Sequence, residues 1–105
     1  MSDQKPLLSI GDNGIEINLR KGDSIKTNGD KTLIQGVKQN IEGGKLEHHA
    51  EKELIQSSNQ IKVTNGGKII NEVQNGILKQ TDNFIEVDGE SEIINKISPD
   101  LGTSI

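Results

Sequence analysis

Apolar and polar residues alternate in short runs along most of the chain, beginning with Ile15, Ile17 and Leu19. Alternation with a period of two is typical of a β-strand that buries one of its faces. Glycine and asparagine interrupt these runs every few residues, as at Asn28-Gly29, and both residues favour turns. The pattern therefore predicts an all-β chain built from many short strands.

A longer repeat accompanies this alternation, because isoleucine recurs every eight residues in the second half of the chain. From residue 62 the octads read KVTNGGKI, INEVQNGI, LKQTDNFI and EVDGESEI. The first half holds a series with the same step, displaced by four residues from the later one. The repeat predicts that both series fill one core. The early series is Ile17, Ile25, Leu33 and Ile41, and the late series is Ile61, Ile69, Ile77, Ile85 and Ile93.

The change between the two series falls within residues 43–58, where the spacing is least regular. Because a displacement of four is even, strand alternation can keep the same face inward through this stretch. An irregular corner is an equal alternative. So is a short helix over residues 45–56, where Leu46, Ala50 and Leu54 stand at helical spacing among good helix formers.

Eight residues suffice for a strand of about five or six residues and a short turn. An octad therefore supplies one side of a coil, and we expect other chains to supply the remaining sides. The composition agrees with this expectation, since only 30% of the 105 residues are hydrophobic and Phe84 is the only aromatic residue. One copy offers little apolar surface against a conformational entropy cost of about 1–2 kcal/mol per residue.

Disorder is the alternative that low hydrophobicity and a 27% content of charged residues favour. Two features oppose it. The chain is rich in β-branched isoleucine and has only two prolines, Pro6 and Pro99. Its apolar residues are also periodic, which an unfolded chain has no reason to maintain. We therefore expect an ordered assembly.

Units of the form I-x-V-x-x-G, at Ile61 to Gly66 and in shorter form at Ile85 to Gly89, resemble the triple-stranded β-helix of contractile-tail spike proteins. That family includes the cell-puncturing needles of tailed bacteriophages and the VgrG-like spikes of type VI secretion systems. The resemblance covers roughly residues 14–97, and it departs from the family where isoleucine, asparagine and lysine replace valine and glycine. It implies an intertwined homotrimer with the nine octad residues on the trimer axis.

The resemblance also implies a function and partners. The chain would be a non-enzymatic spike or needle component that pierces an envelope or helps to deliver effectors. Its partners would be two further copies, tail tube or baseplate hub proteins, and a tip-cap protein or effector, with only transient contact to a target membrane. Residues 1–13 would form a leader or docking segment, residues 14–97 the β-helix, and residues 98–105 a cap or tail.

A bactofilin-like role is the alternative function: a β-solenoid made by a single chain that polymerises end to end as a structural filament. The two hypotheses differ in the mass expected in solution. A spike forms a discrete trimer, whereas the filament protein is a monomer or an open polymer.

Charge and sequence motifs narrow the function classes further. A net charge of −4 without a basic stripe argues against nucleic-acid binding. Cysteine is absent, so disulfides and thiolate chemistry are excluded.

The N-terminal ten residues lack a secretory signal pattern, so we expect synthesis in the cytoplasm and export only through a contractile machine or within a phage tail. No nucleophile elbow, zinc-protease or phosphate-loop motif is present, and we expect no catalytic activity.

The adjacent pair His48-His49 is the only candidate for metal chemistry. Neighbouring residues on a strand point to opposite faces, so the two rings of one chain cannot grip one ion together. His49 continues the eight-residue series that starts at Ile17. Three copies of His49 would then converge on a trimer axis, where they suit a metal or an anion. No other cofactor is expected, and an ordinary surface or packed histidine is the alternative.

Overall fold

The computed structural model describes residues 8–11 and 14–98, which form strands and turns without a helix. This confirms the all-β prediction. No segment of this described part is a helix that could span a membrane. The strands are β1 (Leu8–Gly11), β2 (Gly14–Arg20), β3 (Ser24–Thr27), β4 (Lys31–Gln35), β5 (Val37–Glu42), β6 (Lys45–Ala50), β7 (Glu53–Ser57), β8 (Gln60–Thr64), β9 (Lys68–Val73), β10 (Ile77–Gln80), β11 (Ile85–Val87) and β12 (Glu92–Ile97).

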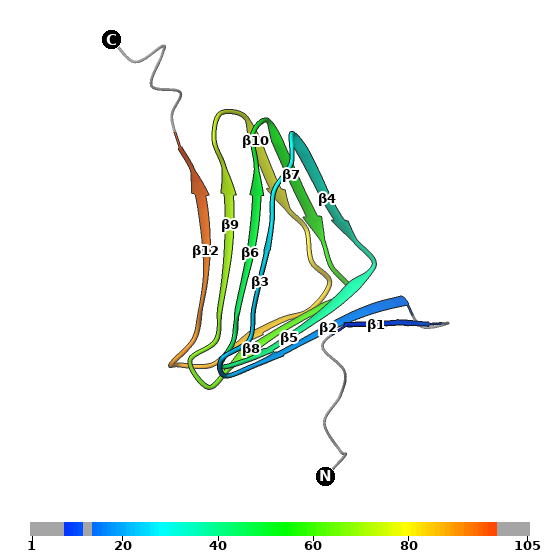
Figure 1. Ribbon diagram of the computed structural model, residues 1–105, viewed down its shortest axis with the longest axis vertical. Helices are drawn as coiled ribbons and strands as arrows, with labels where there is room; N and C mark the ends of the chain where they lie inside the picture. Colours follow the sequence, from blue (N-terminus) through cyan, green and yellow to red (C-terminus); the bar gives the residue numbers. More distant parts are fainter. Residues whose placement is uncertain (1–7, 12–13, 99–105) are drawn as a thin grey trace.

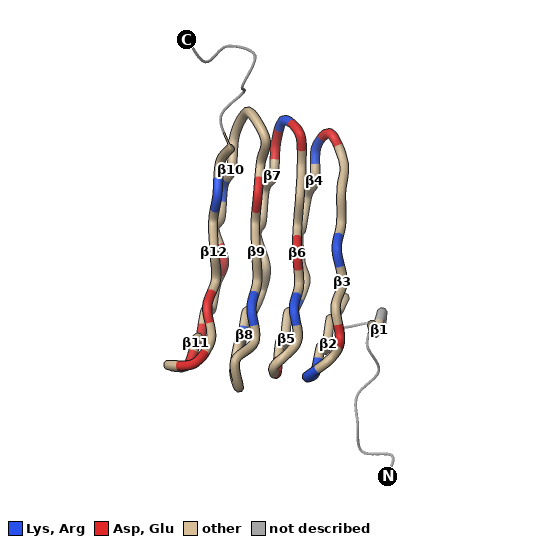
Figure 2. The backbone as a smooth tube through the Cα atoms, turned by 60° about the vertical axis from the view of Figure 1, so that its left-hand side comes forward, with Lys and Arg blue, Asp and Glu red and all other residues tan. Residues whose placement is uncertain are grey.

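The strands wind into a β-solenoid with three sheets as the sides of a triangle (Figure 1). Sheet A has the order β1-β2-β5-β8-β11, sheet B the order β12-β9-β6-β3, and sheet C the order β10-β7-β4. All pairings within the sheets are parallel except that of β1, which runs antiparallel to β2 at the edge of sheet A. Seen from the side, successive coils stack next to one another (Figure 2).

A single chain supplies all three sides of each coil. We number the coils by their strands: coil 1 is β2 to β4, coil 2 is β5 to β7, coil 3 is β8 to β10, and coil 4 contains β11 and β12. Ile61 pairs with Ile85 and Ile69 with Ile93, so three octads complete one turn of the solenoid. The sequence predicts that other chains provide two sides of each coil. The structure instead shows one chain that forms a solenoid, and not an intertwined trimer.

The displacement between the two octad series has a simple origin in coil length. Ile17 pairs with Gln39, and Gln39 pairs with Ile61. Each pair of partners is therefore 22 residues apart in the sequence (39 − 17 and 61 − 39), two fewer than the 24 residues of three octads. The two shortenings together make up the displacement of four. The turns of the early coils are therefore tighter, and Ile41 stacks on Leu19 instead of on Ile17.

Residues 43–58 continue the solenoid. Two strands, β6 and β7, occupy most of this stretch, with a bend at Glu51 and Lys52 between them. The helical alternative for residues 45–56 is wrong, because the helical spacing of Leu46, Ala50 and Leu54 arises from two strands that each place alternate side chains inward. All three of these side chains are buried.

The interior is divided among the three corners of the triangle. An apolar cluster fills the corner between sheets A and B, and a second, smaller one fills the corner between sheets B and C. Apart from the buried Val37, polar side chains occupy the corner between sheets C and A, together with the middle of sheet B, which faces that corner. The first cluster is Leu19, Ile41, Leu46, Ile61, Val63 and Ile69; the second is Ala50, Leu54 and Val73.

The predicted division into a leader, a repeat region and a tail can be followed only in part. Strand β1 belongs to the predicted leader, and it pairs with the first strand of the solenoid. The rest of the leader, residues 1–7 and 12–13, lies outside the described residues, as does most of the predicted tail, residues 99–105.

Candidate functional site

Most of the nine octad residues face the interior of the solenoid. Ile41, Ile61 and Ile69 are fully buried in the first apolar cluster. Ile17, Ile25 and Ile93 are partly buried and pack against the same cluster.

Leu33 and Ile77 differ from this expectation, because they lie on the outer face of sheet C. They are 61% and 52% exposed. On β10 the inner position belongs to Leu78, which pairs with the buried Leu54 and packs on the second apolar cluster. Strand alternation then turns Ile77 outward. The octad period alone does not reveal this, since a turn can shift which residue of the next strand faces inward.

The last coil presents an apolar end. Ile85, Val87 and Ile97 continue inner columns of the solenoid, and they are 47%, 38% and 55% exposed. Their partners one coil earlier, Ile61, Val63 and Val73, are 0% exposed. The exposure arises because, among the described residues, no strand continues sheet A beyond β11 or sheet B beyond β12. This open end is the candidate functional site.

The open end is also acidic. Red acidic positions gather on β11 and the start of β12 (Figure 2). Coil 4 has a net charge of −3, whereas residues 14–36, which make up coil 1 and its final turn, have a net charge of +1. Coil 4 holds Glu86, Asp88, Glu90 and Glu92 against Lys96; coil 1 holds Arg20, Lys21, Lys26 and Lys31 against Glu16, Asp23 and Asp30.

His48 is the central residue of the polar interior. It is 1% exposed and lies in the middle of sheet B. Its Nε2 donates to Gln39 Oε1 at 3.0 Å, since a carbonyl oxygen can only accept. Its Nδ1 lies 3.4 Å from the Thr27 hydroxyl, whose single proton is shared with the Glu47 carbonyl oxygen at the same distance. Each ring nitrogen of the neutral imidazole therefore has a polar neighbour.

Burial lowers the pKa of His48 to about 4, because the charged form would lose its hydration. The neighbouring His49 lowers the pKa further, and the carboxylate of Asp82 acts in the opposite direction. His48 is therefore neutral at physiological pH, and its role in the interior is that of a hydrogen-bonded packing residue.

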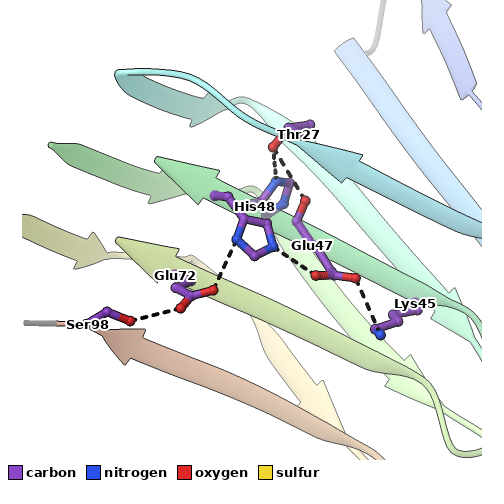
Figure 3. Close-up of polar contacts among 7 residues, drawn as sticks. Thr27, Lys45, Glu47, His48, Glu72 and Ser98 are labelled. Carbon is purple, nitrogen blue, oxygen red and sulfur yellow. Dashed lines mark hydrogen bonds and ion pairs between the residues drawn. The ribbon is translucent and has the colours of Figure 1, made fainter. Parts of the chain in front are cut away.

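His49, the predicted metal ligand, lies on the outer face of sheet B. Its Nε2 is 2.8 Å from a Glu47 oxygen and its Nδ1 is 3.1 Å from a Glu72 oxygen. Figure 3 shows Glu47 and Glu72 within one row of contacts that runs from Lys45 on β6 to Ser98 after β12. The row lies beside a hollow of about 520 Å³ that His49 and Glu72 help to line.

The interior position predicted for His49 belongs instead to His48. The physical reason is the shortened early coils, which break the eight-residue series before it reaches residue 49. Both nitrogens of His49 contact carboxylate oxygens, one of Glu47 and one of Glu72. Among the described residues, no group of three or more histidine, aspartate or glutamate side chains is arranged to hold a metal.

Sequence reasoning missed the buried polar residues of the interior. They are Gln39, His48, Gln56, Ser58 and Asn71. A signal was present, because each of His48 and Asn71 stands two positions from an apolar residue on either side, in the inward phase of its strand. A polar residue bracketed in this way by inward apolar residues is a candidate for burial.

No protein-family model, curated protein or solved structure matches the chain.

Proposed function

We propose that this protein is a structural element that assembles end to end into a filament, with the open end of coil 4 as its docking surface. This is the function that the solenoid geometry supports best. The chain has a regular, elongated stack of coils, and a stack of this kind is extended by adding further coils to its end.

A single observation carries the proposal: side chains that are completely buried in coil 3 are exposed at the equivalent positions of coil 4. A second copy placed against this end would cover Ile85, Val87 and Ile97 as coil 4 covers their counterparts. Each fully buried side chain of this size contributes about 1.5–3 kcal/mol. The free edges of β11 and β12 would also gain backbone hydrogen bonds.

Charge favours a head-to-tail arrangement. The acidic coil 4 of one copy would face the coil 1 end of the next, where β1 forms the edge of sheet A and coil 1 has a net charge of +1. Two coil 4 ends placed against each other would instead bring two net charges of −3 together. Such like-charge contact is unfavourable at an interface.

The mass and shape of the purified protein test this function. Light scattering coupled to size-exclusion chromatography is expected to show open-ended polymers whose size rises with concentration, and electron microscopy is expected to show thin filaments. A species that remains monomeric at every concentration would exclude the proposed filament.

A trimeric spike of a contractile injection machine is the second candidate, and the outer face of sheet C favours it. Leu33 and Ile77 are exposed there, and Ile55 lies beside Leu33 in register. Three solenoids that set their sheets C around a common axis would bury these residues. A discrete trimer with no larger species would support this candidate over the filament.

A further inference from the structure

The polar corner between sheets C and A, with the part of sheet B that faces it, contains buried atoms without hydrogen-bond partners. Within the described part of the chain these are Gln56 Nε2, Gln56 Oε1, Asn71 Oδ1 and Asp82 Oδ2. Gln56 and Asn71 are each only 1% exposed. A buried polar group without a hydrogen-bond partner destabilises the folded state by about 1–3 kcal/mol. Four such atoms in one short solenoid therefore indicate that a bound molecule supplies the missing hydrogen bonds.

The repeat places Asn71 opposite Gln56. One coil later, Asn95 donates a hydrogen bond to Gln80 across the interior at 2.7 Å. Asn95 pairs in register with Asn71, and Gln80 pairs in register with Gln56. Asn71 and Gln56 are therefore the equivalent pair one coil earlier. They do not bond to each other: one hydrogen of Asn71 Nδ2 is donated to Asn95, and both polar atoms of the Gln56 amide and Asn71 Oδ1 have no partner.

Asp82 reaches the same corner from the following coil. Its Oδ1 accepts the backbone N–H of Ser58 at 2.7 Å. Ser58 lies two residues after Gln56, and both side chains are buried. The Ser58 hydroxyl accepts from Gln39 Nε2, which joins this group to His48. Asp82, with its unpartnered Oδ2, therefore lies next to Ser58 in the same polar corner.

The chemistry of these atoms identifies the occupant. Three of the four are acceptor oxygens and one is an N–H donor. The occupant must therefore donate more hydrogen bonds than it accepts from the protein. Water does so while still accepting from Gln56 Nε2, and buried water commonly makes about three such bonds. Because one water donates only two hydrogen bonds, three acceptors require at least two waters.

We propose that the corner between sheets C and A is a water-binding site in which at least two internal waters bridge Gln56, Asn71 and Asp82. The site is separate from the open end and does not depend on filament assembly. It explains how the solenoid keeps amides in a core whose other two corners are apolar. A one-residue slip of a coil would bring apolar side chains to the bound waters, so the site also favours the observed register.

A high-resolution crystal structure of the full chain tests the site directly. We expect electron-density peaks at hydrogen-bond distance from Gln56, Asn71 and Asp82, with the distances and coordination of water. A direct bond between Gln56 and Asn71 with no peak would overturn the proposal. A metal ion at this position, identified by anomalous scattering and by stoichiometric metal in solution, would overturn it as well.

The sign of a stability change provides a second test. If waters are bound, Gln56→Leu removes one of their partners and should lower Tm by at least about 5 °C. If the corner is empty, the same substitution removes two unsatisfied atoms and should raise Tm, which would refute the site. Gln60→Leu is the matched control. Gln60 lies on the outer face of sheet A, where it donates a hydrogen bond to Asn40. The Tm of this variant should stay near that of the wild type.

Discussion

Ile85 lies in register with Ile61 on the neighbouring strand of sheet A, one full coil later in the chain, yet Ile85 is 47% exposed and Ile61 is 0% exposed. The two side chains occupy the same inner column, so their different exposure reflects position along the solenoid axis. Ile61 has a coil on each side, whereas Ile85 has a described coil only on the side of Ile61. The interior of coil 4 is therefore an unfinished continuation of the core.

Ile85→Lys is expected to abolish end-to-end assembly, because it places a charge in the joint between two copies. Light scattering should report a monomer with a β-rich circular dichroism spectrum. Leu33→Lys is the matched control, since Leu33 is even more exposed but faces outward from sheet C. The control should still form filaments. If Leu33→Lys instead dissolves a discrete trimer and Ile85→Lys leaves it intact, the copies associate laterally through sheet C and not end to end.

Assembly is expected to weaken as salt is added, because the joint brings an acidic coil 4 against a coil 1 of net positive charge. Raising the ionic strength from 0.01 to 0.1 M shortens the screening length from about 30 to about 10 Å. Sedimentation across this range should show a falling polymer fraction. Stronger assembly at high salt would indicate contact between ends of like charge, which contradicts the head-to-tail arrangement.

Ile61→Ala should lower the free energy of unfolding by about 2–5 kcal/mol, since it opens a cavity in the first apolar cluster. Ile77→Ala should change it by about 0.5 kcal/mol or less, since Ile77 lies on the outer face of sheet C. Denaturant unfolding of both variants measures the difference. Equal losses at the two positions would mean that all octad residues share one core, as the sequence period suggests.

Stability should fall as the pH decreases from about 6.5 to about 4 because of His48. The unfolded chain takes up a proton near the ordinary pKa of 6.5, whereas the folded chain does so only near pH 4. The contribution is complete above pH 6.5, and roughly 3 kcal/mol is lost across this window. Carboxylates titrate over part of it, so the measured quantity is the difference from His48→Gln, which should lack this component. His49→Gln should retain it.

Gly76→Ala should destabilise the turn between sheets B and C by about 1–3 kcal/mol. A Cβ atom at Gly76 would overlap the carbonyl oxygen of Lys52 in the coil before. That oxygen accepts the N–H of Ile77, so the strain would also disturb the start of β10. Gly89→Ala is the control, because nothing lies within 4 Å of its Cβ position. Thermal unfolding should separate the two variants by several degrees.

Local chemistry predicted the strands well. Alternation at Ile15, Ile17 and Leu19 marks β2 correctly, and the isoleucines at 61 and 69 are the core residues that the repeat predicted. These features depend on neighbours in the sequence and on the period of a strand, so the sequence alone predicts them. The outward position of Ile77 could not be predicted, because the turn before β10 decides which residues of that strand face inward.

The candidate site was less predictable. Exposure at Ile85 follows from the lack of a described strand beyond β11, and nothing in the residue itself distinguishes it from Ile61. His48, and not the predicted His49, faces the interior because the two early coils are shorter than three octads. The sequence does not show this shortening; it follows from the pairing of Gln39 with both Ile17 and Ile61.

The sequence by itself determined that the chain is all-β, that it repeats in octads, and that isoleucines such as Ile61 and Ile69 lie in its core, because strand alternation and turn chemistry are local properties. Only the tertiary structure decided that three octads of one chain close a coil, where the octad period equally suits three chains. It also decided which corner of the triangle is polar. These outcomes depend on contacts between residues a full coil apart in the chain, and their geometry is set by the turns at the corners.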